Sequence, residues 1–372
     1  MVPDVTRLTR DLIRFETINP PGNEKQLALH IGKILNASGF SVTYPSLDQE
    51  RLHVIADKGL SENLPPIVFS GHLDVVPLGN ETWSVAPFEG VKKEGRLYGR
   101  GASDMKGGVA AMIVAAIRAS EGDLPAGGLR IILTAGEEYG CHGARNLVSS
   151  GEDLGSARLL IVGEPTSNFP YIGHKGGLFL NARAIGRSAH SSVPHLGENA
   201  IYKAARAITK IEKMNLKGAG DSLLGKPTVN VGIINGGSNF NSVPDRAGFT
   251  IDIRSTGERP NIALLTDLRN HLGPEIEIEP FVDLAPVLSD PSDEAIRTIF
   301  RICGDALEDE ITPKTITYLT DAAVLQTYYN GIPTVILGPG EPEMAHQVDE
   351  YCDIQKLEKS VEIYVHIIAG CY

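Results

Sequence analysis

Four short apolar segments, each followed by a glycine and then by a histidine or an acidic residue, constrain the fold of this 372-residue chain more than any other feature. The segments lie at 67–69, 129–134, 159–162 and 333–337. Continuous apolar runs of this length are typical of strands in the centre of a parallel sheet. In open α/β sheets the site lies at the carboxyl ends of the strands. We therefore expect an α/β fold whose polar strand ends meet at one edge.

The first of these segments ends in His72 and Asp74, which are two positions apart. In a strand, residues at i and i+2 point to the same side. There the aspartate can accept the proton of the far imidazole nitrogen and leave the near nitrogen free for a metal. A histidine satisfied inside the core is the alternative, and this motif alone does not exclude it.

Further candidate ligands follow the other segments. A glycine-rich stretch at 95–108 delivers Asp104 just before a helix expected over 109–118, and it lacks the spacing of a phosphate-binding loop. Glu137 and Glu138 are neighbours, so one can bind metal while the other faces water and acts as a base, although two solvated glutamates in a turn would look the same. The candidate metal ligands are His72, Asp104, Glu138, Glu164 and His346.

This set of imidazoles and carboxylates suits Zn²⁺, with Co²⁺ or Mn²⁺ as substitutes. Five ligands exceed what one catalytic zinc with an open position uses. Two metals that share a carboxylate fit better, and a pair roughly 3.5–4 Å apart would hold a hydroxide and polarise a carbonyl. Glu137 is the expected general base, which takes a proton from the metal-bound water and returns it to the leaving amine.

The middle of the chain follows a different pattern. Strands are expected at 178–184, 228–234, 248–254 and 276–279, and helices at 199–213 and 261–272. Two helices on an antiparallel sheet form an α+β arrangement, unlike the alternating units on either side. We expect an inserted lid domain at 177–284 and a discontinuous catalytic domain at 1–176 and 285–372, with a mixed, mostly parallel sheet flanked by helices.

Composition limits the partners and the compartment. With 34 basic and 46 acidic residues the net charge is −12, which argues against nucleic acid. The four cysteines are scattered, which argues against a disulfide framework and favours a reducing cytoplasm. The N-terminus has no signal-peptide core, and the longest apolar run, at 109–117, is too short to span a membrane, so no membrane role is expected.

Several motifs together resemble the family of acetylornithine deacetylase, succinyl-diaminopimelate desuccinylase, aminoacylase and carboxypeptidase G. They are SGHLDVVP at 70–77, GRGASDMKG at 99–107, GEE at 136–138, GEPT at 163–166 and AH at 345–346. The resemblance implies two zinc ions, with His72 and Glu164 on one, Glu138 and His346 on the other, and Asp104 between them. It also implies that Asp74 orients His72 without binding metal and that Glu137 is the base.

The same resemblance extends to the inserted domain, which in this family also dimerises. His190, in GRSAHSSVPH at 186–195, matches a histidine that reaches the substrate carbonyl oxygen across a dimer interface. Asn241 and Arg254 match positions that hold the substrate carboxylate, a task for which the fork of an arginine is suited. An ordinary salt bridge inside the lid is the alternative for Arg254. A homodimer through the lid domain is therefore expected.

The expected activity is hydrolysis of the amide bond of a small N-acyl amino acid. The segment TYLTDAA at 317–323 is more like that of the deacetylases than the Ser/Gly/Thr-rich loop of the desuccinylases, and it leaves both substrates open. A metallo-dipeptidase or carboxypeptidase of the same architecture is the alternative, since the same site breaks any suitably placed amide. A non-catalytic relative would show gaps among the ligands, and none is present. Serine or cysteine nucleophile chemistry is disfavoured, since the chain has no G-x-S-x-G elbow.

Overall fold

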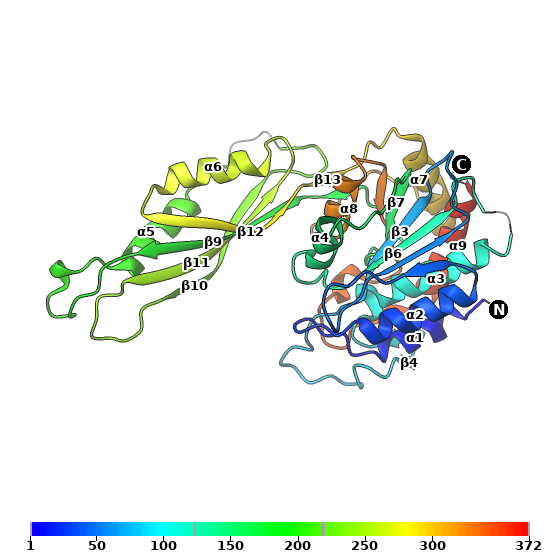
Figure 1. The fold of residues 1–372 in the computed structure, drawn as a ribbon, viewed down its shortest axis with the longest axis horizontal. Helices are drawn as coiled ribbons and strands as arrows, with labels where there is room; N and C mark the ends of the chain where they lie inside the picture. Colours follow the sequence, from blue (N-terminus) through cyan, green and yellow to red (C-terminus); the bar gives the residue numbers. More distant parts are fainter. Residues whose placement is uncertain (1, 123, 217–219, 371–372) are drawn as a thin grey trace. The chain divides into compact units, whose positions relative to one another are not determined.

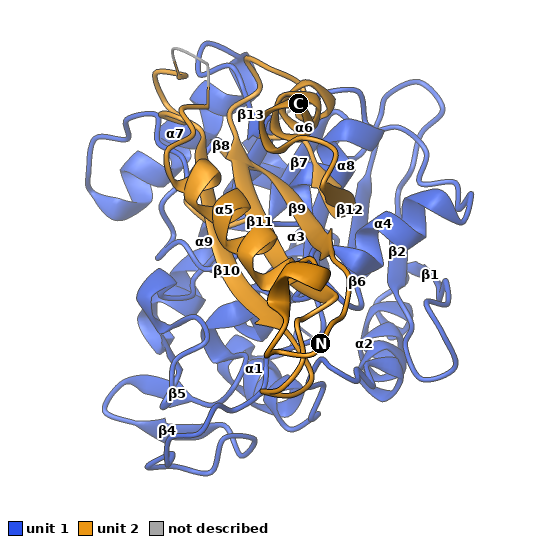
Figure 2. Cartoon of the chain, turned by 90° about the vertical axis from the view of Figure 1, so that its left-hand side faces the viewer, with its two compact units in different colours: residues 1–173, 287–316, 320–372 blue, residues 174–286, 317–319 orange. Residues whose placement is uncertain are grey.

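A computed structural model describes residues 2–122, 124–216 and 220–370 of the chain, so Cys371 lies outside the described residues. The chain divides into two units (Figure 2). Unit 1 contains the residues up to 173, those at 287–316 and those from 320 onward, and unit 2 contains 174–286 and 317–319. Figure 1 shows the helices and strands of both units.

The centre of unit 1 is a six-stranded sheet with the order β1-β2-β6-β3-β7-β14. Neighbours among β6, β3, β7 and β14 run parallel, whereas β2 is antiparallel to both β1 and β6. Every residue of β3, β6, β7 and β14 is buried, as their apolar sequences predict. The strands are β1 (Ser41–Thr43), β2 (Val54–Lys58), β3 (Ile67–His72), β6 (Leu129–Thr134), β7 (Leu159–Val162) and β14 (Thr334–Ile336).

Helices cover this sheet. Helix α3 is buried on all sides and packs against α1, α9 and β3. Helix α2 packs on β1 and β2 and ends at Ala37, and Gly39 follows it with a φ of +83°, which only glycine adopts readily. Helix α8 packs on α4, β7 and β14, and α7 packs on α9. The helices are α1 (Val5–Ile13), α2 (Lys25–Ala37), α3 (Gly107–Ala119), α4 (His142–Ser149), α7 (Glu294–Leu307), α8 (Ala322–Tyr328) and α9 (Ile354–Gly370).

Smaller elements complete unit 1, and two of them lie where the chain passes from one unit to the other. A three-stranded antiparallel sheet has the order β15-β5-β4, and β8 pairs with β13. The irregular helix η1 comes directly before α3, and it contains Asp104 in a non-helical conformation. These elements are β4 (Val91–Lys93), β5 (Arg96–Tyr98), η1 (Ala102–Lys106), β8 (Gly173–His174), β13 (Val287–Leu288), η3 (Pro342–Met344) and β15 (Tyr351–Asp353).

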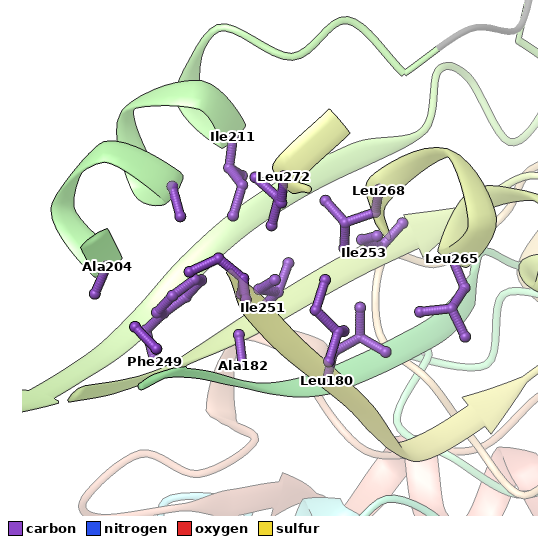
Figure 3. Packing of buried hydrophobic residues seen from close by; sticks show 14 of the residues in the cluster. Leu180, Ala182, Ala204, Ile211, Phe249, Ile251, Ile253, Leu265, Leu268 and Leu272 are labelled. Carbon is purple, nitrogen blue, oxygen red and sulfur yellow. The ribbon is translucent and has the colours of Figure 1, made fainter. Parts of the chain in front are cut away.

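Unit 2 is a four-stranded antiparallel sheet, ordered β10-β11-β9-β12, with α5 and α6 on one face. Alternate residues of β9 and β11 pack against the helices to form its core, as Figure 3 shows for Leu180 of β9, Ile251 of β11 and Leu268 of α6. Asn199 caps α5 by accepting a hydrogen bond from the backbone N–H of Tyr202. The elements are β9 (Gly176–Ile185), η2 (Pro194–Leu196), α5 (Ala200–Glu212), β10 (Thr228–Gly236), β11 (Arg246–Ser255), α6 (Asn261–Leu272) and β12 (Ile276–Leu284).

The predicted fold class is confirmed, because a mixed, mostly parallel sheet and a separate antiparallel sheet are both present. Within the described part of the chain, no helix combines the length and the apolar character that a membrane crossing needs.

Candidate metal centre

The carboxyl ends of three neighbouring strands bring the first candidate residues together. His72 at the end of β3 is in register with Thr134 at the end of β6, and Ser70 is in register with Val162 of β7. Glu137 and Glu138 follow β6 by three and four residues, and Glu164 follows β7 by two. The strand-end pattern of the sequence therefore corresponds to a real convergence of polar side chains.

One group of side chains gathers around His72, which is 1% exposed. Its Nε2 atom lies 3.0 Å from Oδ1 of Asp104 and 3.9 Å from Oε2 of Glu164. Ligand atoms of His72, Glu137 and Glu164 lie within 4.8 Å of one another, and so do those of His72, Asp104 and Glu138. This spacing is compatible with a bound metal ion, because a small inward shift of the side chains would bring the ligand atoms to coordination distance.

A second group gathers around His346, which is half-exposed in the turn that follows η3. Its Nε2 atom lies 3.0 Å from Oε2 of Glu138 and 3.4 Å from Oδ2 of Asp104. The two carboxylate oxygens of Asp104 thus face two different histidines, Oδ1 toward His72 and Oδ2 toward His346. A carboxylate placed in this way can bridge two cations.

The electrostatics of the group favour bound cations. Burial raises the pKa of the Glu138 carboxyl to about 7 and, with the charge of Glu164 beside it, the pKa of Glu137 well above its ordinary value. Burial also raises the pKa of Glu164. Burial alone would lower the pKa of His72, but the bond to Asp104 and the surrounding carboxylates raise it well above its ordinary value. The buried carboxylates therefore have too little positive charge nearby to neutralise them.

The residues present fit a metal on two grounds. Oε1 of Glu138 is buried and has no hydrogen-bond partner, so its lone pairs are available to a cation. The donor atoms around it are imidazole nitrogens and carboxylate oxygens, which suit Zn²⁺, Co²⁺ or Mn²⁺. The described residues thus contain candidate ligand sets for a divalent cation.

The position of Asp74 corrects one expectation. Nδ1 of His72 donates to the backbone carbonyl of Asp74 at 2.9 Å, whereas the carboxylate is 3.6 Å away. A carbonyl oxygen only accepts, so Nδ1 carries a proton and Nε2 is the nitrogen turned toward the candidate ligands, as predicted but through another atom. The reason is that β3 ends at His72, so the i, i+2 alternation of a strand does not extend to Asp74.

The Asp74 carboxylate instead holds the turn that carries the two glutamates. Its Oδ1 atom accepts from the backbone N–H of Gly136 at 2.9 Å and of Glu137 at 3.0 Å. Its Oδ2 atom accepts from the N–H of Glu138 at 3.2 Å and from Nδ2 of Asn19 at 2.8 Å. Asp74 is fully buried, so it fixes this turn without facing solvent.

Sequence reasoning missed two residues beside Glu137. Sγ of Cys141 lies 3.4 Å from Oε1 of Glu137 and can donate to it. The carboxylate of Asp321 is buried and accepts a hydrogen bond from the hydroxyl of Thr134. Burial raises the pKa of Asp321 to about 6. Asp321 lies in the TYLTDAA segment, whose sequence was interpreted only for its bearing on substrate choice.

The three residues predicted in the inserted domain lie within unit 2, and only two of them are neighbours. The backbone N–H of Ser191 donates to the carbonyl of Asn241 at 3.0 Å, which places the exposed His190 beside the loop of Asn241. Arg254 lies on β11 and makes two hydrogen bonds, of 2.8 and 3.1 Å, with Asp252. Its guanidinium also lies over the ring of Phe179.

Comparisons with known proteins agree with this architecture. The family model described as "Peptidase family M20/M25/M40" matches residues 68–370. The chain is 32% identical to a probable succinyl-diaminopimelate desuccinylase of Staphylococcus aureus, over 93% of this chain and 94% of that protein. It is also 32% identical to an acetylornithine deacetylase of Myxococcus xanthus, over 90% and 89%.

Among solved structures, an M20 family metallo-carboxypeptidase of Sulfolobus solfataricus has the same fold, with a TM-score of 0.80 at 18% identity over 98% of both chains. The fold, the ligand sets and these relatives define a metal-dependent hydrolase that acts on amide bonds. The chain belongs to peptidase family M20/M25/M40, which confirms the resemblance predicted from its motifs.

Proposed function

We propose that the chain is a dinuclear zinc amidohydrolase that removes the N-acyl group from an amino acid. The observation that carries the proposal is the position of Asp104, whose two oxygens face His72 and His346. In this proposal His72 and Glu164 hold one zinc, and Glu138 and His346 hold the other. Asp104 would contribute one oxygen to each of them.

Two zinc ions at these residues would supply a Lewis acid for the amide carbonyl and would lower the pKa of a bound water. Glu137 is the proton carrier of the reaction. It takes the proton of the attacking water on its carboxylate and gives it to the leaving amine. Glu137 is 9% exposed, its carboxylate lies 3.4 Å from Sγ of Cys141, and its backbone N–H is held by Asp74.

We assign the substrate contacts to unit 2. Strands β9 and β11 pair along their length, with Ile185 opposite Arg246 at one end and Gly177 opposite Arg254 near the other. His190 and Asn241 belong to loops beyond the Arg246 end, so they lie at the opposite end of the sheet from Arg254. These two ends lie roughly 27 Å apart along β11, at about 3.4 Å per residue. No small substrate spans that distance, so His190 and Arg254 can serve one substrate only if two copies of the chain supply them. This supports a homodimer in which His190 acts on the partner's substrate.

In such a dimer His190 donates a hydrogen bond to the carbonyl oxygen of the scissile amide, where negative charge develops. Arg254 binds the carboxylate of the amino acid. Its pairing with Asp252 leaves Nη1 free of that partner and holds the guanidinium in a fixed plane, so the substrate meets an oriented donor.

A metallo-dipeptidase or carboxypeptidase remains the second candidate function. The likeness of fold to the Sulfolobus metallo-carboxypeptidase favours it, whereas the two relatives at 32% identity are named as a desuccinylase and a deacetylase. Both candidate functions use the same metal-binding residues and differ only in the group bound beside the amide.

The test is a parallel assay of N-acetylornithine, N-succinyl-diaminopimelate and simple dipeptides with zinc-loaded protein. We expect kcat/KM to be at least about tenfold higher for an N-acyl amino acid than for any dipeptide, which corresponds to about 1.4 kcal/mol in the barrier. A higher kcat/KM for the dipeptides would replace the first candidate by the second. Absence of hydrolysis by protein with two bound zinc ions would contradict both.

A further inference from the structure

A buried glutamate outside the proposed ligand set holds the loop that carries Asp104. The side chain of Glu350 has no exposed surface. Its Oε1 atom accepts from the backbone N–H groups of Ser103 at 2.8 Å and of Asp104 at 3.0 Å. Its Oε2 atom accepts from the N–H of Gly101 at 2.9 Å. Three backbone donors of one irregular loop are thus satisfied by one carboxylate.

These donors need such a partner because the backbone of the loop is not regular. Asp104 has φ −118° and ψ 94° inside η1, so its N–H cannot enter the hydrogen-bond ladder of a helix. An unpaired backbone N–H in the interior is costly, which makes a side-chain acceptor the means of stabilising this conformation. The carboxylate of Glu350 is therefore the acceptor that holds the backbone N–H of Asp104 in this conformation.

Arg100 extends the contact to the segments of other ligands. Its Nη1 atom donates to Oε2 of Glu350 at 2.7 Å and to the carbonyl of Gln347 at 3.1 Å. Its Nη2 atom donates to the carbonyl of Pro77 at 3.2 Å. Gln347 directly follows His346, and Pro77 lies in the segment that follows β3. One buried ion pair therefore joins the Asp104 loop to the turn of His346 and to the segment after His72.

The charges of this pair are matched. Glu350 would add one more buried carboxylate beside a group that is already short of positive charge. The guanidinium of Arg100, itself 1% exposed, balances that charge, so the negative potential of the ligand group is left for cations. The pair can thus fix backbone geometry without competing for the metals.

We propose that Glu350, paired with Arg100, is a positioning residue that places the Asp104 carboxylate between His72 and His346 and thereby sets the affinity for both metals. The proposal rests on the proposed function in one respect, namely that Asp104 binds metal. Glu350 itself contacts no metal, since both of its oxygens are occupied by the loop and by Arg100.

The experiment is a Zn²⁺ titration of metal-free full-length protein, with wild type, E350Q and the control D57N. The control breaks another ion pair of unit 1 that is largely buried, in which Arg130 donates to Asp57 at 2.7 and 2.9 Å. In E350Q an amide NH2 group replaces one carboxylate oxygen, so a donor faces backbone N–H groups that are themselves donors. We expect its zinc affinity to fall by about 10- to 100-fold, the range found when groups that orient metal ligands are changed. D57N should bind zinc as the wild type does.

A second measurement separates positioning from loss of stability. Loaded with Co²⁺, the wild type and D57N should have the same visible absorption spectrum, whereas that of E350Q should change because the ligand geometry changes. Removal of Glu350 alone leaves Arg100 buried and unpaired, which lowers stability. The double variant R100Q/E350Q buries no unpaired charge, and it should recover melting temperature but show the same loss of zinc affinity as E350Q.

Three results would overturn the inference. If E350Q or the double variant binds two zinc ions with wild-type affinity, Glu350 does not set the site. An equal loss of zinc affinity in D57N would show that breaking any ion pair of unit 1 weakens zinc binding. If the wild type binds no zinc, the proposed function fails together with the inference. Two zinc ions in the wild type with unchanged affinity in E350Q would remove the inference alone.

Discussion

The candidate residues of the two units differ in how they are held. Those of unit 1 are mostly buried and contact one another, since His72 contacts Asp104 and His346 contacts Glu138. Those of unit 2 are exposed or half-exposed, and His190 and Arg254 belong to opposite ends of one sheet. The fold of unit 1 alone thus brings its candidate ligands together, whereas in the proposed function the residues of unit 2 form a site only when two chains combine.

The largest effect is expected for a residue that serves both proposed metals. D104N keeps the shape of the side chain but removes the charge shared by His72 and His346. We expect loss of zinc from both positions and a fall in kcat/KM of about 10³-fold or more, which corresponds to several kcal/mol of lost charge stabilisation. Zinc content by elemental analysis and the rate of hydrolysis are measured, with D57N as the matched control. Wild-type zinc content in D104N would show that Asp104 is not a ligand.

The second effect separates base from ligand within unit 1. E137Q removes the proton acceptor but leaves Glu138 and the Asp74-bound turn in place. Zinc content should stay at the wild-type value, while kcat falls by about 10²- to 10⁴-fold. The ligand atom of Glu137 lies near those of His72 and Glu164, so it could also be a ligand. Loss of zinc in E137Q would identify it as one.

The third prediction addresses unit 2 and the second copy. H190A should keep its zinc and lose about 10²-fold in kcat. When H190A and E137Q are refolded together, a mixed dimer has one site with both Glu137 and the partner's His190. We expect mixing to restore about a quarter of wild-type activity, because half of randomly formed dimers are mixed and each has one working site. Activity no higher than that of the separate variants would show that His190 acts within its own chain.

The smallest effect concerns a buried imidazole of unit 1. His53 accepts a hydrogen bond from the N–H of Ala135 on Nδ1, and burial lowers its pKa to about 4. The unfolded chain takes up this proton near pH 6.5 but the folded chain does not, so stability is lost as the pH falls from about 7 toward 4.

At pH 5 this loss is about 2 kcal/mol of unfolding free energy. The asparagine side chain of the variant H53N can accept the same hydrogen bond but cannot be protonated. Thermal unfolding of zinc-loaded protein at pH 7 and pH 5 should therefore show a smaller decrease in melting temperature for H53N than for the wild type. Equal decreases in both proteins would show that His53 does not remain neutral.

The sequence alone predicts the elements whose local pattern is strong. Strands β6 and β7 and helix α6 begin and end where the pattern places them. For strand β12 the sequence predicts an end at Glu279, but the strand continues to Leu284 past a register shift between Pro280 and Val282. The predictions do not include α7 and α9, although both are regular helices of the fold.

The candidate ligands were predictable to different degrees. His72, Glu138 and Glu164 follow apolar strands, so the topology of a parallel sheet brings them together without further information. His346 lies in a turn with φ +64°, after η3, nine residues beyond the apolar segment at 333–337, so the strand-end pattern indicated it less directly than the other ligands. Glu350 and Asn19 act through backbone and side-chain contacts with residues far away in sequence, for which no local pattern exists.

The central claim is that Asp104 joins two metal ions, and anomalous X-ray scattering at the zinc edge from crystals grown with Zn²⁺ tests it most directly. The account predicts two peaks per chain, each about 2.0–2.2 Å from a different oxygen of Asp104, one beside His72 and the other beside His346. A single peak, or two peaks of which neither contacts Asp104, would contradict it.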